Sequence, residues 1–126
     1  MSAEEAEPAP AARRSTGRLR LRLPAQALAH SGVVRLVLCD LSAGGAKVFA
    51  KVALPLGRDI VLRWGNHEAF GAVVWVREGF HGVQFDEPLA NAVLTDTRHL
   101  QDTTGMNRDA LAEWMADKGY AFGKAL

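Results

Sequence analysis

Short alternations of apolar and polar residues, separated by turn residues, fill the chain from about Arg18 to Phe85. In the first of them, Leu19, Leu21 and Leu23 alternate with arginines, which is the period of a strand with one buried face. Further segments with strand patterns follow at about residues 33–39, 46–52, 60–64, 69–76 and 80–85. Six short strands joined by short turns predict a mainly β fold. A six-stranded antiparallel β-barrel is favoured, because so small a sheet otherwise leaves exposed edges.

Turn residues set the expected ends of these strands. Pro24 should end the first strand, because proline cannot donate to a sheet ladder. Residues 40–45 (DLSAGG) should form a tight turn, since glycine tolerates positive φ and Asp and Ser bond neighbouring amides. Trp64 and Trp75 lie on apolar alternations and are expected in the core.

Helical spacing replaces the strand pattern after residue 85. Asp86 can cap a helix and Pro88 suits its first turn, followed by an apolar stripe. Residues 101–106 resemble a linker, and a second helix capped by Asn107 should stop near Gly119. The expected organisation is a disordered tail (1–12), a barrel with a flanking helix (13–100), and a linker with an amphipathic helix (101–126). The stripe of the first helix is Leu89, Ala92, Val93 and Leu100, and the face of the second is Leu111, Trp114 and Met115.

Positive charge is concentrated in one part of the chain, although the net charge is only +1. Residues 13–63 carry ten Lys or Arg against two acids, whereas residues 64–126 carry five against nine. This asymmetry argues against broad binding of DNA or RNA and for a local anionic partner. No apolar run is long enough to span a membrane, and the acidic N-terminus is unlike a signal peptide. A cytoplasmic protein without membrane insertion is therefore expected.

Catalytic and metal-binding chemistry finds no support in the pattern. The single cysteine, Cys39, excludes an internal disulfide and a Cys-rich zinc site. The four histidines lack metal-ligand spacing and are expected at the surface or in capping positions. Ser42 lacks the context of a nucleophile elbow. No catalytic residue, metal or cofactor is predicted.

Two motifs carry the chemistry of an anion or nucleotide site. The first contains Arg13, Arg14 and Arg18, whose guanidinium groups can chelate phosphate or a guanine edge in paired hydrogen bonds. The second has the pattern DxSxxG. Its aspartate can accept protons from guanine, and its serine and Gly-rich amides suit a phosphate oxygen. The residues of this second motif are Asp40, Ser42, Gly44 and Gly45.

These motifs, in this order on a six-strand pattern, resemble the PilZ family of bacterial receptors for the second messenger cyclic di-GMP. The resemblance runs from about Arg13 to Leu89 and includes the segments GAKV, LPLG, GAVVWV and GVQFDEPL. It implies a non-enzymatic, nucleotide-binding signalling protein whose arginine segment becomes ordered on binding and whose changed surface signals to an unidentified protein partner. The residues it implies as ligand-binding are Arg13, Arg14, Arg18, Asp40, Ser42, Gly44 and Gly45.

Alternatives remain at this point. The arginine run can be the solvated face of an edge strand, and the DxSxxG turn can be hairpin chemistry alone. A PilZ-like adaptor can act by protein–protein contact without ligand. An RNA-binding small barrel would need exposed aromatic rings on its strands, which the tryptophans are not expected to provide. Trp114 fits packing on the barrel and binding of a partner about equally well.

Overall fold

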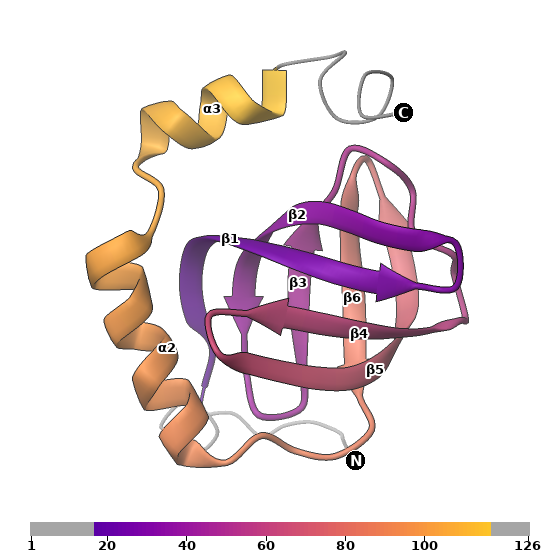
Figure 1. Ribbon diagram of the computed structural model, residues 1–126, viewed down its shortest axis with the longest axis horizontal. Coiled ribbons are helices and arrows are strands. Elements are labelled where there is room, and N and C mark those ends of the chain that lie inside the picture. Colours follow the sequence, from indigo (N-terminus) through magenta and orange to yellow (C-terminus); the bar gives the residue numbers. More distant parts are fainter. Residues whose placement is uncertain (1–16, 117–126) are drawn as a thin grey trace.

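Six antiparallel strands close into a barrel in the order β1-β2-β3-β6-β5-β4, as predicted (Figure 1). The computed structural model describes residues 17–116 of the 126-residue chain. The barrel closes where β1 pairs with β4, and every other pair joins strands that are consecutive in the sequence, except β3 with β6. The strands are β1 (Leu19–Ala29), β2 (Gly32–Leu41), β3 (Gly45–Phe49), β4 (Asp59–Trp64), β5 (His67–Arg77) and β6 (Phe80–Phe85).

The barrel interior is filled by alternate residues of the strands, as the sequence pattern predicts. Leu38, Val48, Leu62 and Val73 are completely buried there. Trp64 is also in the core, with 2% of its surface exposed. Trp75, however, was wrongly expected in the core and is 42% exposed. The β5–β6 ladder shifts register between Val73 and Trp75, so the alternation of β5 does not continue through this bulge.

Pro24 does not end β1, contrary to the expectation. It lies within the strand, opposite Val37 of β2. On the other side of β1, pairing with β4 begins only at Gln26. Proline is tolerated in a strand where its missing N–H faces no neighbour, and this part of β1 is such an edge.

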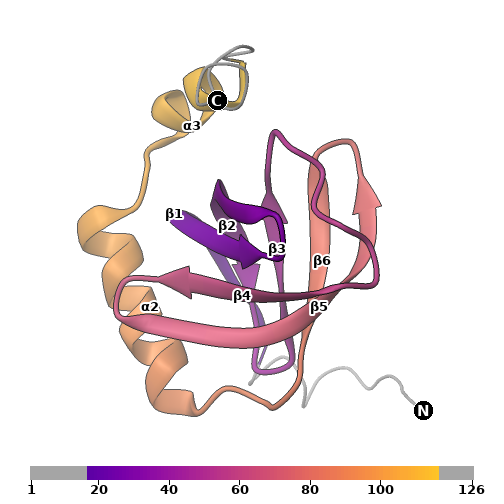
Figure 2. The same cartoon turned by 45° about the vertical axis from the view of Figure 1, so that its right-hand side comes forward.

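Helix α2 (Asn91–Thr104) lies along the barrel, and its start and end both differ from the expectation (Figures 1 and 2). Residues 86–90 are not helical and form a strap instead. Strap bonds compete with helix formation there: the Asp86 N–H donates to the Phe70 carbonyl, and the Leu89 N–H donates to the Ala43 carbonyl. The helix also continues to Thr104, through residues expected as linker.

Two sets of polar contacts attach α2 to the barrel. The Trp64 indole N–H donates to the Thr97 hydroxyl at 2.9 Å, and both groups are buried. At the helix C-terminus, the Gln101 side chain accepts from the Arg22 N–H, and the Met106 N–H donates to the Arg22 carbonyl. The β1–β2 register shifts between Arg20 and Leu23, so these contacts satisfy backbone groups at an irregular point of the ladder.

Helix α3 (Arg108–Ala116) begins as predicted, with the Ala110 N–H donating to the Asn107 side chain at 2.7 Å. The expected end near Gly119 lies outside the described residues. Trp114 packs edge-on against Phe49 with ring centroids 5.9 Å apart. The Lys51 ammonium lies 4.6 Å from the same indole ring. No residue of α3 is fully buried. None of the helices in residues 17–116 is long and apolar enough to cross a membrane.

His81 is fully buried, contrary to the expectation of surface or capping histidines. Its Nε2 accepts from the Leu54 N–H at 3.0 Å, and its Nδ1–H donates to the Gly79 carbonyl at 3.0 Å. Both bonds are made by a neutral ring. Burial lowers the pKa of His81 from its ordinary value of 6.5, against a smaller opposing effect of the Gly79 carbonyl.

Stability should therefore fall as the pH drops below about 6.5, because the unfolded chain then binds a proton that the folded His81 does not. We expect the midpoint of urea unfolding to decrease between pH 7.5 and 5.5 in the parent protein. In His81→Gln the midpoint should be lower at pH 7.5 but should depend less on pH over this interval. An equal pH dependence in the two proteins would contradict the role of His81.

Candidate functional site

Asp40 lies on the barrel wall between two cationic residues. In the strand register it is opposite Arg20 of β1 on one side and Lys47 of β3 on the other. Its carboxylate is 3.4 Å from the Lys47 ammonium, and only 12% of the Asp40 side chain is exposed. Both ladders shift register beside Asp40. Bulges of this kind re-aim side chains at functional sites.

The DxSxxG turn is shorter than expected. Asp40 and Leu41 belong to β2 and Gly45 begins β3, because their backbones continue the ladder. Only residues 42–44 remain as a turn. The Ser42 N–H and hydroxyl both donate to the Gly45 carbonyl, at 2.9 and 3.3 Å. The serine hydroxyl is thus fixed in the turn that follows Asp40, and its oxygen can still accept hydrogen bonds.

The two glycines of the motif have different surroundings. A Cβ atom at Gly45 would lie 2.4 Å from the Val83 carbonyl oxygen of β6, so glycine is needed for the close approach of the strands. A Cβ atom at Gly44 would meet nothing within 4 Å. Gly44 is exposed, and its carbonyl accepts from the Phe85 N–H. Open space next to the turn is therefore found at Gly44.

Arg18 is exposed and lies just before β1. Because Leu19 is opposite Leu41, the chain at Arg18 lies beside the Ser42 turn. Arg13 and Arg14 lie outside the described residues. Arg20 was not predicted as a site residue, yet it lies directly across the ladder from Asp40. Its place in the alternation showed that it faces outward, but only the strand register shows its partner.

An open pocket of about 340 Å³ adjoins Lys47, and sequence reasoning missed it. The Lys47 ammonium is 5.4 Å from the Phe80 ring centroid. The Trp75 ring lies over Gly82 of β6, where a Cβ atom would come 2.0 Å from the indole nitrogen. An exposed ring held in this way suits stacking on a flat ligand. The lining residues are Lys47, Trp75, Arg77, Glu78 and Phe80.

Cys39, next to Asp40 in β2, has no chemistry of its own here. Burial raises the pKa of its thiol to about 11, with smaller effects of Lys47, Asp40 and the Phe49 backbone. A thiol of this kind is uncharged and unreactive at neutral pH. Residues 17–116 contain no group of three or more His, Cys, Asp or Glu that could hold a metal ion.

The outer face of β1, β2, β3, β6 and β5 thus combines the Asp40 carboxylate with several cations and exposed rings. The carboxylate can accept from N–H groups of a base, the cations can bind phosphate, and the rings can stack. All of these groups lie on strands of the barrel wall. These features fit a flat ligand that is anionic and carries hydrogen-bond donors.

The chain matches one family model and is similar to a solved structure. A comparison with curated proteins finds no match. Among solved structures, the chain is similar to the PilZ domain of CeSA from a cellulose-synthesizing bacterium, with 18% identity and a TM-score of 0.47, over 68% of this chain and 95% of that one. The family model "PilZ domain" matches residues 12–101. This match covers most of the chain and includes β1 to β6 and most of α2, and the chain therefore belongs to the PilZ domain family.

Proposed function

We propose that this protein is a receptor for cyclic di-GMP, which binds on the outer face of the barrel around Asp40. PilZ domains are a non-catalytic receptor family that typically binds this second messenger. The observation that carries the proposal is the position of Asp40, nearly buried in the barrel wall between Arg20 and Lys47 and next to the Ser42 turn. An aspartate in this place is not required by the core, since it faces outward.

The proposed roles follow from the chemistry of each group. Asp40 accepts hydrogen bonds from the N–H groups of a guanine, and Ser42 contacts a phosphate or base. Arg14 and Arg18 clamp guanine edges and phosphates, with Arg13 beside them. The exposed Trp75 ring provides a stacking surface on the same wall.

The Asp40–Lys47 ion pair must rearrange when ligand binds. The Lys47 side chain is 42% exposed, so its ammonium can turn to a phosphate without losing contact with water. A guanine can then take its place on the carboxylate. The arginine segment becomes ordered over the site, since a dianionic ligand offers charge-assisted bonds that offset the lost entropy. The altered surface then signals to a protein partner.

A single-stranded RNA partner is the second candidate, and one specific observation favours it. Trp75 is exposed beside Lys47, Arg77 and Phe80, an arrangement of rings and cations that also suits single strands. Asp40 disfavours it, because a carboxylate repels a phosphate backbone. Calorimetric titration with cyclic di-GMP, with GMP and with a short single-stranded RNA tests both. Binding of cyclic di-GMP alone supports the receptor, and binding of RNA alone contradicts it.

We further propose that residues 107–126 form an output element, not a lid required for folding. Deleting them preserves the Met106 N–H bond to Arg22 and removes the contact of Trp114 with Phe49. Since no residue of α3 is fully buried, we expect the truncated protein to keep a cooperative thermal transition and its affinity for cyclic di-GMP. Loss of the transition would identify the segment as a lid and contradict the output role.

A further inference from the structure

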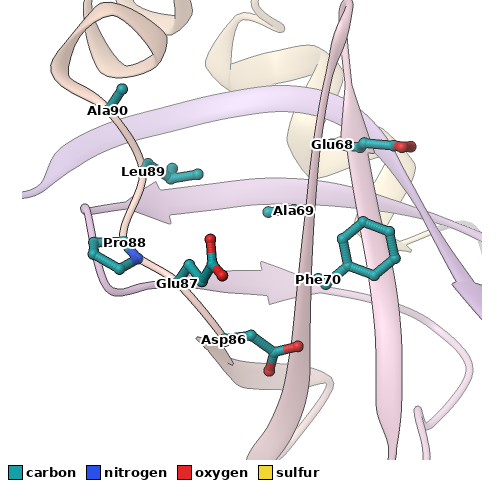
Figure 3. A pocket seen from close by; sticks show the side chains of 8 residues that line it. All are labelled: Glu68, Ala69, Phe70, Asp86, Glu87, Pro88, Leu89 and Ala90. Carbon is teal, nitrogen blue, oxygen red and sulfur yellow. The ribbon is translucent and has the colours of Figure 1, made fainter.

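A groove of about 400 Å³ lies between the strap of residues 86–90 and the first half of β5 (Figure 3). We call it the strap groove. Much of its lining is apolar, with Ala69 of β5 and Pro88, Leu89 and Ala90 of the strap. Phe70 adds an aromatic ring to the lining, and 57% of this residue is exposed.

Three carboxylates line the same groove. Glu68 lies 3.6 Å from the Arg63 guanidinium, and both side chains are about half exposed. Within residues 17–116, no ion pair holds Asp86 or Glu87. Figure 3 shows the side chains of Asp86 and Glu87 directed toward β5. Carboxylates beside an exposed ring match a guanidinium group, which binds carboxylates in pairs of hydrogen bonds and stacks on aromatic faces.

The strap groove lies close to the start of β1. The Leu89 N–H donates to the Ala43 carbonyl at 2.8 Å, and Leu19 lies opposite Leu41 in the ladder. The strap is therefore about two strand spacings across and two residues along the chain from the start of β1, or roughly 12 Å. Figure 1 shows the start of β1 and the strap at the same end of the barrel. Arg14 precedes Gly17, the first described residue, by a length of extended chain of about 10 Å.

We propose that the strap groove holds the arginine segment, residues 13–18, when no ligand is bound. The segment carries three arginines and no acid, opposite in sign to the groove. A tethered segment also faces the groove at an effective concentration in the millimolar range, well above that of a separate basic peptide. The proposal rests on the proposed function and changes only its ligand-free state: cyclic di-GMP would draw the same arginines to Asp40 and Ser42 from the groove and not from a free chain, so the groove would limit ligand affinity.

A spin label on the arginine segment tests this proposal without ligand. In full-length Cys39→Ala/Ser15→Cys protein, a nitroxide on residue 15 should broaden the amide signals of Glu68, Phe70 and Glu87. The double substitution Asp86→Asn/Glu87→Gln should abolish this broadening. The matched control, Asp102→Asn/Glu113→Gln, makes the same change of charge on exposed residues of α2 and α3 and should leave the broadening unchanged.

Absence of broadening in the groove would overturn the proposal and leave the groove to a basic partner. Broadening that survives Asp86→Asn/Glu87→Gln would overturn it as well. Saturating cyclic di-GMP should move the broadening to the amides of Ser42 and Gly44. If the ligand-free result is obtained and cyclic di-GMP changes nothing, the groove contact stands and the proposed receptor function fails.

Discussion

Asp40→Ala and Arg18→Ala should each weaken the binding of cyclic di-GMP by about 1.5–3 kcal/mol, the range for hydrogen bonds to charged groups. This corresponds to about a 10- to 150-fold rise in Kd at 25 °C. The fold should survive both changes, because Arg18 is exposed and the Asp40–Lys47 pair is open to water on the lysine side. Removing such a partly exposed pair alters stability by about 1 kcal/mol or less.

Two substitutions of the same chemical kind serve as controls. Arg58→Ala and Asp59→Ala remove an exposed arginine and an exposed aspartate at the start of β4, and neither residue takes part in the proposed site. Calorimetric titration of all four variants should show weak binding only for Arg18→Ala and Asp40→Ala. Equal affinity in all four proteins would remove Asp40 and Arg18 from the site.

The strands could be predicted because their alternation directly encodes which face is buried. In β4, Ile60, Leu62 and Trp64 face the core in the predicted alternation. The short turn after β4 begins at Gly65, which has the positive φ that glycine permits. Such features depend on neighbours in the sequence, and a single chain contains all the information that they need.

The errors arose where distant segments decide the outcome. Trp75 is exposed because β5 bulges against β6 and its ring lies over Gly82. Pro24 is accepted in β1 because β4 pairs only from Gln26 onward. The strap is not helical because its N–H groups bond to β5 and to the Ser42 turn. None of these contacts is visible in local periodicity.

In the candidate site, too, local sequence predicted some features, and contacts between distant segments decided the others. The motifs identified Asp40 and Ser42 as chemically suitable groups, but their cationic neighbours Arg20 and Lys47 follow only from the strand register. Motif reasoning also assigned both paired glycines to the ligand site, with Gly45 leaving space for the ligand. The structure separates them, since Gly45 is a packing position between strands and Gly44 lies in open space.

Gly45→Ala should lower the free energy of unfolding by about 3 kcal/mol, the upper part of the usual range for overpacking. The added methyl group would meet the Val83 carbonyl oxygen at 2.4 Å. This atom belongs to the backbone of β6 and cannot rotate away as a flexible side chain could. Relief requires β3 to move from β6, beside the hydrogen-bonded turn that holds Ser42. For a domain with about 5–15 kcal/mol of total stability, this is a large loss.

Gly44→Ala is the matched control, because it adds the same methyl group one residue earlier where nothing lies within 4 Å. Its stability should differ from that of the parent by less than about 1 kcal/mol. Urea unfolding at pH 7.5 measures both variants, and titration with cyclic di-GMP is done where each is still folded. If Gly45→Ala is unstable but binds normally while folded, this glycine serves the barrel wall and gives no evidence for ligand binding. A stable Gly45→Ala protein with impaired binding would contradict this interpretation and assign the glycine to the ligand.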